Sequence, residues 1–162
     1  HSCVFVGCQG SWGCVMARFE RIRPQSFLVE TTREALAAFG HTVPDSIVTV
    51  DSRFDVDDDT RFPLVVVLAG SSQATDMGVY GAASTLRGTW IVADRDPVAA
   101  EMLANNLCDA LVDWSRTGSR TAQGGISQIT VTAEPVPYQG SDTADVYMYT
   151  MSATMVARQR GL

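Results

Sequence analysis

The clearest alternation of apolar and polar positions lies between residues 96 and 114. The apolar residues recur every three or four positions and so share one helical face: Ala99, Leu103, Leu107, Ala110, Leu111 and Trp114. The polar residues of the opposite face are spaced by four: Glu101, Asn105, Asp109 and Asp113. Asp96 and Pro97 suit the N-cap and the first helical position. The pattern predicts a surface helix that packs on a sheet.

A second helix is predicted from Ser26 to Phe39, where the apolar spacing is again helical. Leu28, Ala35 and Leu36 fall near one face, and Gly40 directly after the segment is a typical helix stop.

Three segments before the long helix have the patterns of β-strands. A short strand is predicted around Ile47 to Val50. The β-branched run from Phe62 to Gly70 has no polar face, which indicates a central strand buried on both sides. Residues 84–93 alternate, with Leu86, Trp90 and Val92 on one side. The intervening segment, 71–84, is rich in Gly, Ser and Ala and is predicted to be a long loop.

The last two strands are predicted at 126–134 and 145–158, and the short connection between them favours an antiparallel hairpin. The final strand is apolar on both faces, which requires a cover. Its large apolar residues are Tyr147, Met148, Tyr149, Met151 and Met155. Burial within the sheet is the simplest cover, and an adjacent subunit is the second.

The succession of helix, strands, helix and strands predicts an α+β fold, with a mixed, largely antiparallel sheet and two main helices packed on one face. A chain of 162 residues, 46% hydrophobic and 19% charged, fits one globular domain. No apolar run approaches the ~18 residues of a membrane span. Because Met16 resembles a natural start, residues 1–15 are predicted to be an N-terminal extension and residues 16–162 the domain.

Three of the four cysteines lie in that extension, at Cys3, Cys8 and Cys14. Their spacing differs from the paired C-x2-C arrangement of structural zinc sites, and His1 is the one histidine nearby. A disulfide framework is disfavoured because the fourth cysteine, Cys108, falls at a buried helix position. The extension is either a clasp on a neighbouring subunit or additional chain.

The charge balance disfavours a nucleic-acid-binding surface. Twelve basic residues, all arginine, stand against 18 acidic ones, for a net charge of −6, whereas phosphate neutralisation needs clustered Lys and Arg. Asp55, Asp57, Asp58 and Asp59 form an acidic run that is predicted to be a solvated loop.

Candidate catalytic, metal and cofactor motifs are weak. The segment after residue 70 lacks the spacing of a phosphate-binding loop. Asp94 and Asp96 form a D-x-D pair that could hold a cation, although helix capping explains both. Nucleophilic catalysis would pair Cys108 with His41 or His1, and neither pairing is favoured. We therefore expect no catalytic residue, no metal and no cofactor, and a protein that is not an enzyme.

From about Ser26 to Arg158 the order of elements, with "RFPLVVVLAG" and "STLRGTWIVADRDPVAAEMLANNLCDALVDW" at its centre, resembles the tail terminator family of long-tailed bacteriophages. The resemblance implies a virion protein, assembled in the host cytoplasm, that forms a hexameric ring at the head-proximal end of the tail. Such a ring caps the tail tube, stops its polymerisation and presents a docking surface to the head-to-tail connector.

The resemblance also implies partners and contact residues. The partners would be copies of the same chain, the tail tube protein and the connector protein, with DNA passing through the lumen without specific binding and no membrane involved. The subunit or tube contacts would come from loop 69–84 and the extension: Ser71, Ser72, Gln73, Met77, Tyr80, Cys3, Phe5 and Trp12. The lumen would be lined by the acidic run, Asp55, Asp57, Asp58 and Asp59.

Other functions stay open. A neck or head-completion connector subunit shares the size and the ring. A small ligand-binding module and a hydrolase belong to different classes. Oligomeric state separates the ligand-binding module from a ring-forming protein, and mutation of Cys108, the last candidate nucleophile, tests the hydrolase.

Overall fold

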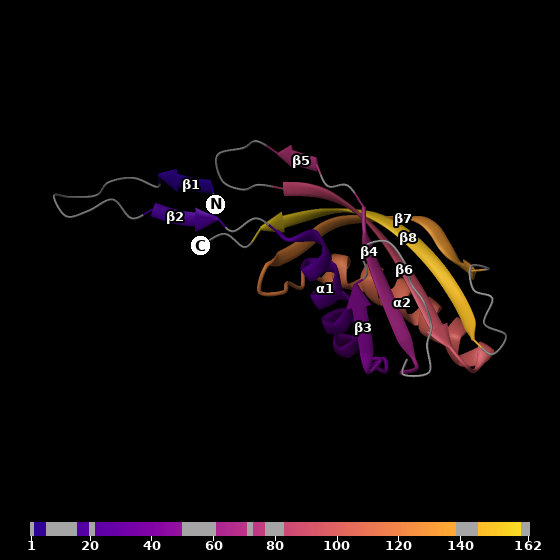
Figure 1. Cartoon of the computed structure of the whole chain (residues 1–162). Coiled ribbons are helices and arrows are strands. Elements are labelled where there is room, and N and C mark those ends of the chain that lie inside the picture. Colours follow the sequence, from indigo (N-terminus) through magenta and orange to yellow (C-terminus); the bar gives the residue numbers. More distant parts are fainter. Residues whose placement is uncertain are drawn as a thin grey trace.

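The computed structural model describes residues 2–5, 16–19, 22–49, 61–70, 73–76, 83–138 and 146–159. Within these ranges the chain forms two helices and eight strands (Figure 1). Six of the strands form one mixed, mostly antiparallel sheet. The predicted α+β fold is confirmed.

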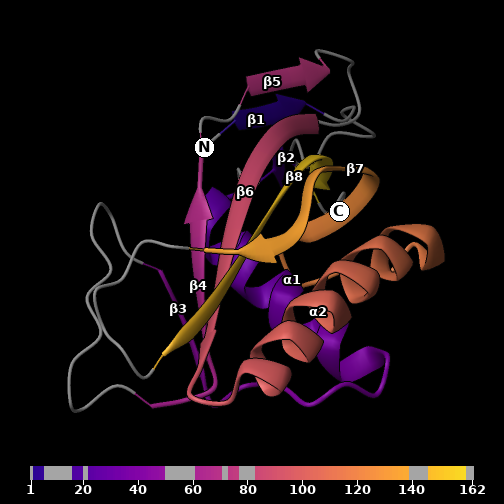
Figure 2. The same cartoon turned by 90° about the vertical axis from the view of Figure 1, so that its right-hand side faces the viewer.

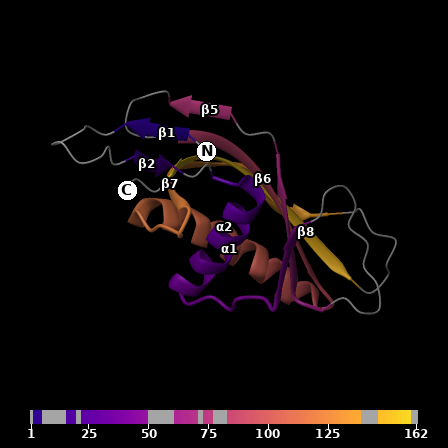
Figure 3. The ribbon, with the colours of Figure 1, turned by 60° about the vertical axis from the view of Figure 1, so that its left-hand side comes forward.

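The main sheet has the strand order β3-β4-β6-β8-β7. These strands span Ser46–Thr49, Leu64–Ala69, Ala83–Asp94, Tyr147–Gln159 and Gly124–Pro137, respectively. Strands β3 and β4 are parallel, and the other neighbours are antiparallel. Both helices lie on the same side of this sheet (Figure 3). The predicted arrangement of two helices on one face is therefore what the structure has.

Helix α1, Pro24–Ala38, begins two residues before the predicted start because Pro24 suits the first helical turn. It ends where Gly40 adopts a φ of 75°, a left-handed conformation that glycine accepts without strain. The His41 N–H then donates to the Leu36 carbonyl at 2.9 Å, which satisfies one of the last carbonyls of the helix.

Helix α2, Pro97–Thr117, has the predicted cap and the predicted buried face. The Asp96 carboxylate accepts a hydrogen bond from the Val98 N–H at 3.0 Å, and Gly118 ends the helix at a φ of 67°. The buried residues are the predicted stripe without Ala99 and with two further alanines: Ala100, Leu103, Ala104, Leu107, Ala110, Leu111 and Trp114. Ala99 is only partly buried.

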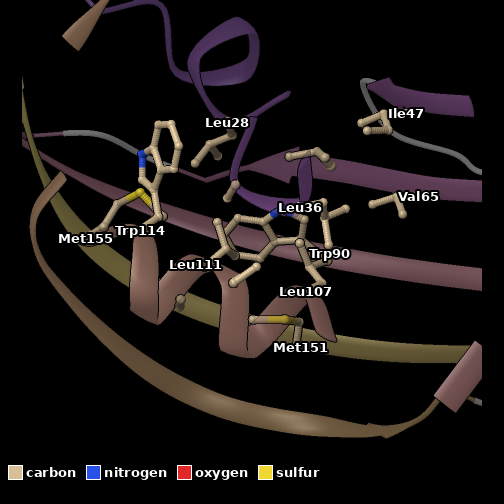
Figure 4. Packing of buried hydrophobic residues seen from close by; sticks show 14 of the residues in the cluster. Leu28, Leu36, Ile47, Val65, Trp90, Leu107, Leu111, Trp114, Met151 and Met155 are labelled. Atoms are coloured by element: carbon tan, nitrogen blue, oxygen red, sulfur yellow. The ribbon is translucent and has the colours of Figure 1, made fainter. Parts of the chain in front are cut away.

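Trp90 on β6 lies at the centre of the core between the sheet and the helices (Figure 4). Its indole N–H donates to the Thr32 hydroxyl of α1 at 2.9 Å, and that hydroxyl donates to the Leu28 carbonyl at 2.6 Å. The buried indole is thereby satisfied, which avoids the cost of an unpaired donor. This chain of hydrogen bonds joins the sheet to α1.

Strand β4 is buried on both faces, as its sequence predicts. Val65 and Val67 belong to the core beneath the helices. Leu64 and Val66 belong to a second apolar cluster on the opposite face, together with Met148 of β8. Strand β4 lies between β3 and β6, so its backbone is paired on both sides.

The predicted hairpin of the last two strands is also present, with β8 between β6 and β7. Met151 and Met155 are buried in the core beneath the helices, and Met148 is buried on the other face. The three methionines of this strand are therefore covered within the chain, the first of the two alternatives, whereas Tyr147 is exposed.

The prediction of a continuous loop over 71–84 was wrong in one respect. Residues Gln73–Asp76 form a short strand, β5, that pairs antiparallel with the beginning of β6. Its sequence, QATD, has no apolar alternation, so the strand depends on pairing with Ala83 to Thr85 rather than on a pattern of its own.

A separate two-stranded sheet joins β1, Ser2–Phe5, to β2, Met16–Phe19. The pairing is antiparallel and links residues on the two sides of the boundary predicted after residue 15. The division into an extension and a domain stays a prediction.

Candidate subunit-contact surface

The predicted contact residues are placed only in part. Gln73 lies in β5, and Cys3 and Phe5 lie in β1. The remaining predictions fall outside the described residues: Ser71, Ser72, Met77, Tyr80 and Trp12, and the acidic run Asp55, Asp57, Asp58 and Asp59.

Strand β5 places Gln73 at one end of the sheet. Gln73 is paired with Thr85, close to the beginning of β6. Among the described strands β5 pairs with β6 alone, so its other edge has no strand beside it. An unpaired strand edge can accept a further strand from another chain. The structure thus puts Gln73 in a strand that lies at an edge among the described strands.

At the opposite end of the sheet β6 ends and leads into α2 (Figure 2). Several apolar side chains of the elements near this end are exposed. Six large apolar side chains are exposed among the described residues, and five of them belong to the first turns of α2 or to the paired end of β7 and β8. We call these five residues the apolar end: Val98, Met102, Val136, Tyr138 and Tyr147. Strand pairing places Tyr147 on the helix side of the sheet and Val136 and Tyr138 on the opposite side.

Helix α2 contributes the two most exposed members of the apolar end. Val98 is 61% exposed and Met102 is 59% exposed, and the two are four residues apart, so they lie on one side of the helix. The Asp96 cap holds the first turn at Val98. These apolar side chains are therefore fixed on a regular helix and directed to solvent.

The hairpin contributes the other three members. Tyr147 is paired with Asp94, the last residue of β6, which places it one strand away from the beginning of α2. The Tyr138 N–H donates to the Met148 carbonyl at 2.8 Å, which holds Tyr138 against the same strand. Val136 pairs with Thr150 in that strand.

A groove of about 270 Å³ adjoins Met102. Its walls come from the beginning of α2, the approach to β4 and the segment after α1, and include Pro63, Ala99, Leu103 and Thr42. Asp94 and Asn106 supply polar groups at its margin. The mainly apolar lining extends the apolar end into a concave surface, which suits an inserted side chain better than a flat face does.

The D-x-D pair beside this groove acts as a cap. The Asp94 carboxylate accepts from the Asp96 N–H at 3.2 Å, and the Asp96 carboxylate accepts from the Val98 N–H at 3.0 Å. Both carboxylates therefore satisfy backbone donors at the beginning of α2, as the capping interpretation predicts. Among residues whose side chains are described, no group of three His, Cys, Asp or Glu residues is arranged to hold a metal ion.

Cys108 lies on α2 and is half-buried, whereas the sequence predicted a buried position. Burial raises the pKa of its thiol above the ordinary value, and the negative charges of Asp109 and Glu134 raise that pKa further. Because the thiolate is the nucleophilic form, this environment makes Cys108 a poorer nucleophile at neutral pH than a free cysteine.

Neither described helix is both long enough and apolar enough to cross a membrane. Neither a scan against models of protein families nor a search of curated proteins finds a match to this sequence.

Sequence reasoning missed most of the apolar end. Tyr147 was noted as part of an apolar strand, but Val98 and Met102 were not singled out. A signal was available, since neither residue belongs to the apolar stripe that begins at Ala99 and the two are spaced by one turn. An apolar pair off the buried face of an amphipathic helix is the pattern that indicates a contact surface.

Proposed function

We propose that this protein is a structural subunit of a phage tail that assembles into a ring and caps the tail tube. In this role the ring stops tube polymerisation and offers its free face to the head-to-tail connector. The chain acts through contacts with other proteins and not through catalysis.

The observation that carries the proposal is the apolar end. Exposed apolar side chains are ordinary when they are scattered, but a group of them on one surface is typical of a protein contact. Here Val98 and Met102 are both more than half exposed, and Met102 lines a groove. Aromatic residues and methionine are also enriched at protein interfaces.

The two ends of the sheet support a ring rather than a symmetric pair. A closed ring requires two different surfaces on each subunit, because each subunit contacts one neighbour with one surface and the next neighbour with the other. The apolar end lies at the end of β6, whereas the unpaired edge of β5 lies at its beginning. The order of elements, which resembles the tail terminator family, supports the same role.

The experiment is to measure the mass of the full chain in solution by light scattering over a concentration series, and to image the same sample by electron microscopy. The proposal predicts a closed ring whose mass approaches a plateau at six copies. A chain that stays monomeric at every concentration, and that also fails to bind the ends of purified tail tubes, would overturn it.

Control variants make the result specific. Met102→Glu introduces a charge at the apolar end and is expected to weaken the ring. Glu101→Gln alters the neighbouring exposed residue and is expected to leave the ring intact. Equal effects of the two substitutions would indicate that the apolar end is not the contact.

A further inference from the structure

Three arginines line one cavity at the far end of α2, in a protein whose net charge is −6. They line a cavity of about 250 Å³ between the end of α2, the turn that follows it and the strands β7 and β8. The charged and hydroxyl side chains of its lining are Arg116, Arg120, Arg158, Ser115, Ser119 and Ser127. No carboxylate is among the described residues that line the cavity.

Gly125 explains why two of these arginines meet. Strand β7 places Gly125 opposite Arg158 of β8, and an isolated β-bridge places Arg120 opposite the same glycine. A Cβ atom at Gly125 would lie 2.9 Å from the Cγ atom of Arg120. The absence of a side chain at Gly125 therefore lets the stem of Arg120 lie against the backbone of β7.

The arginine charges are not neutralised by the described part of the chain. Its one ion pair at this site joins Arg116 to Asp113 at 3.9 Å, with both side chains largely exposed. Such a pair contributes little. Arg120 and Arg158 form no ion pair with any described residue. Arg116 lies in the last turn of α2, where its positive charge complements the negative end of the helix dipole. Arg120 and Arg158 lie outside that helix, so the dipole does not explain their positions.

The serine hydroxyls limit the kind of ligand. Ser115 donates to the Val112 carbonyl at 2.8 Å and Ser127 donates to the Val156 carbonyl at 3.2 Å, while Ser119 shares a hydrogen bond with Thr117 at 2.8 Å. Recognition is left to the guanidinium groups, which are donors only. A ligand for this cavity must therefore accept hydrogen bonds and carry negative charge.

We propose that this cavity binds a phosphate group, either as the free ion or as a monoester. A phosphate of this kind carries about −1.5 to −2 charge at neutral pH and several acceptor oxygens. It matches three guanidinium groups better than a carboxylate does, because a carboxylate has a single charge and two oxygens, which one arginine can satisfy. The cavity is smaller than the ~300 to 1,000 Å³ of sites for drug-sized ligands. The site is independent of the proposed ring.

The test is calorimetric titration of the full chain with sodium phosphate at constant ionic strength and pH 7.5. Arg120→Gln and Arg158→Gln are each expected to weaken binding by about tenfold or more, since each removes charge-assisted hydrogen bonds. The matched control is Arg33→Gln, an exposed arginine of α1 away from the cavity, and it is expected to leave the affinity unchanged.

A second variant tests whether binding depends on the arrangement of the arginines or only on their total positive charge. Gly125→Ala keeps every arginine and the net charge but displaces Arg120, so it is expected to weaken phosphate binding as well. Thermal unfolding of each variant without phosphate identifies any that fail to fold. A loss of affinity in a folded Gly125→Ala protein supports a built site.

Three results would overturn the proposal. One is the absence of saturable phosphate binding in the millimolar range, and another is an equal loss in Arg33→Gln. The third is binding of a short DNA duplex, lost in Arg120→Gln and Arg158→Gln, by a protein that does not bind phosphate itself. In that case the ligand is a nucleic-acid backbone and not a phosphate dianion.

Discussion

Helix α2 carries similar apolar side chains in two opposite environments. Leu107 and Leu111 are fully buried against the sheet, whereas Val98 and Met102, at the beginning of the same helix, are 61% and 59% exposed. Burial inside the subunit stabilises the fold by about 25 cal/mol per Å² of apolar surface. The exposed pair can gain this stabilisation only from another molecule. The difference separates the residues that fold the subunit from those available for assembly.

The largest expected difference comes from truncating one residue of each kind. Leu107→Ala should lower the free energy of unfolding by about 2 to 5 kcal/mol, because it leaves a cavity in the core. Met102→Ala should change it by no more than about 0.5 kcal/mol, since that side chain is already in water. Urea unfolding at a concentration where the chain is monomeric measures both, and similar losses would contradict the comparison.

The packing around Trp90 gives the next largest effect. A Cβ atom at Gly88 would lie 2.5 Å from the outer ring atom Cη2 of Trp90, so Gly88→Ala should destabilise the protein by about 1 to 3 kcal/mol through overpacking. The clash should shrink in a Trp90→Phe background, which lacks those ring atoms. A double-mutant cycle by urea unfolding measures this coupling, and additive losses would show that the two residues do not compete for space.

The Asp96 cap of α2 is expected to affect both the stability of the fold and any association through the exposed pair. Asp96→Ala removes the hydrogen bond to the Val98 N–H and should cost about 1 kcal/mol of stability. It should also loosen the first turn and so weaken any association through Val98. Thermal unfolding and light scattering measure the two effects. Asp109→Ala, at an exposed position within the helix, is the control and should lower neither.

The smallest expected effect concerns Cys108, at the margin of the core. Because burial and two nearby carboxylates raise the pKa of its thiol, iodoacetamide at pH 8 should alkylate Cys108 more slowly than a cysteine in a short peptide. The raised pKa also means that stability should fall at alkaline pH, as the folded thiol is forced to ionise. Replacing Cys3, Cys8 and Cys14 with serine leaves Cys108 as the one thiol that iodoacetamide can alkylate. Alkylation at the peptide rate would contradict the raised pKa.

Much of the fold could be predicted because its signals are local. Asp96, Pro97 and the apolar stripe define α2, and the β-branched run defines β4. Strand β5 could not be found in this way because it depends on pairing with the distant residues 83–85. The bulges of β7 are equally non-local, since its register against β8 shifts at Ile126/Gln128, Val131/Ala133 and Ala133/Val136.

The candidate sites were harder to predict for the same reason. The apolar end draws Val98 and Met102 from a helix and Tyr138 and Tyr147 from a hairpin. The proposed phosphate site unites Arg116 and Arg120 with Arg158, and Gly125 is paired with the last two of them. Spacing in a sequence reveals neither grouping, because strand pairing brings these residues together.

The most direct test of assembly through the apolar end is light scattering of the full chain beside Val98→Glu and Met102→Glu, each over the same concentration series. The account predicts a ring for the unaltered chain, and smaller species for both variants with unchanged monomer stability. Rings of equal mass in all three proteins, or a monomer throughout, would contradict it.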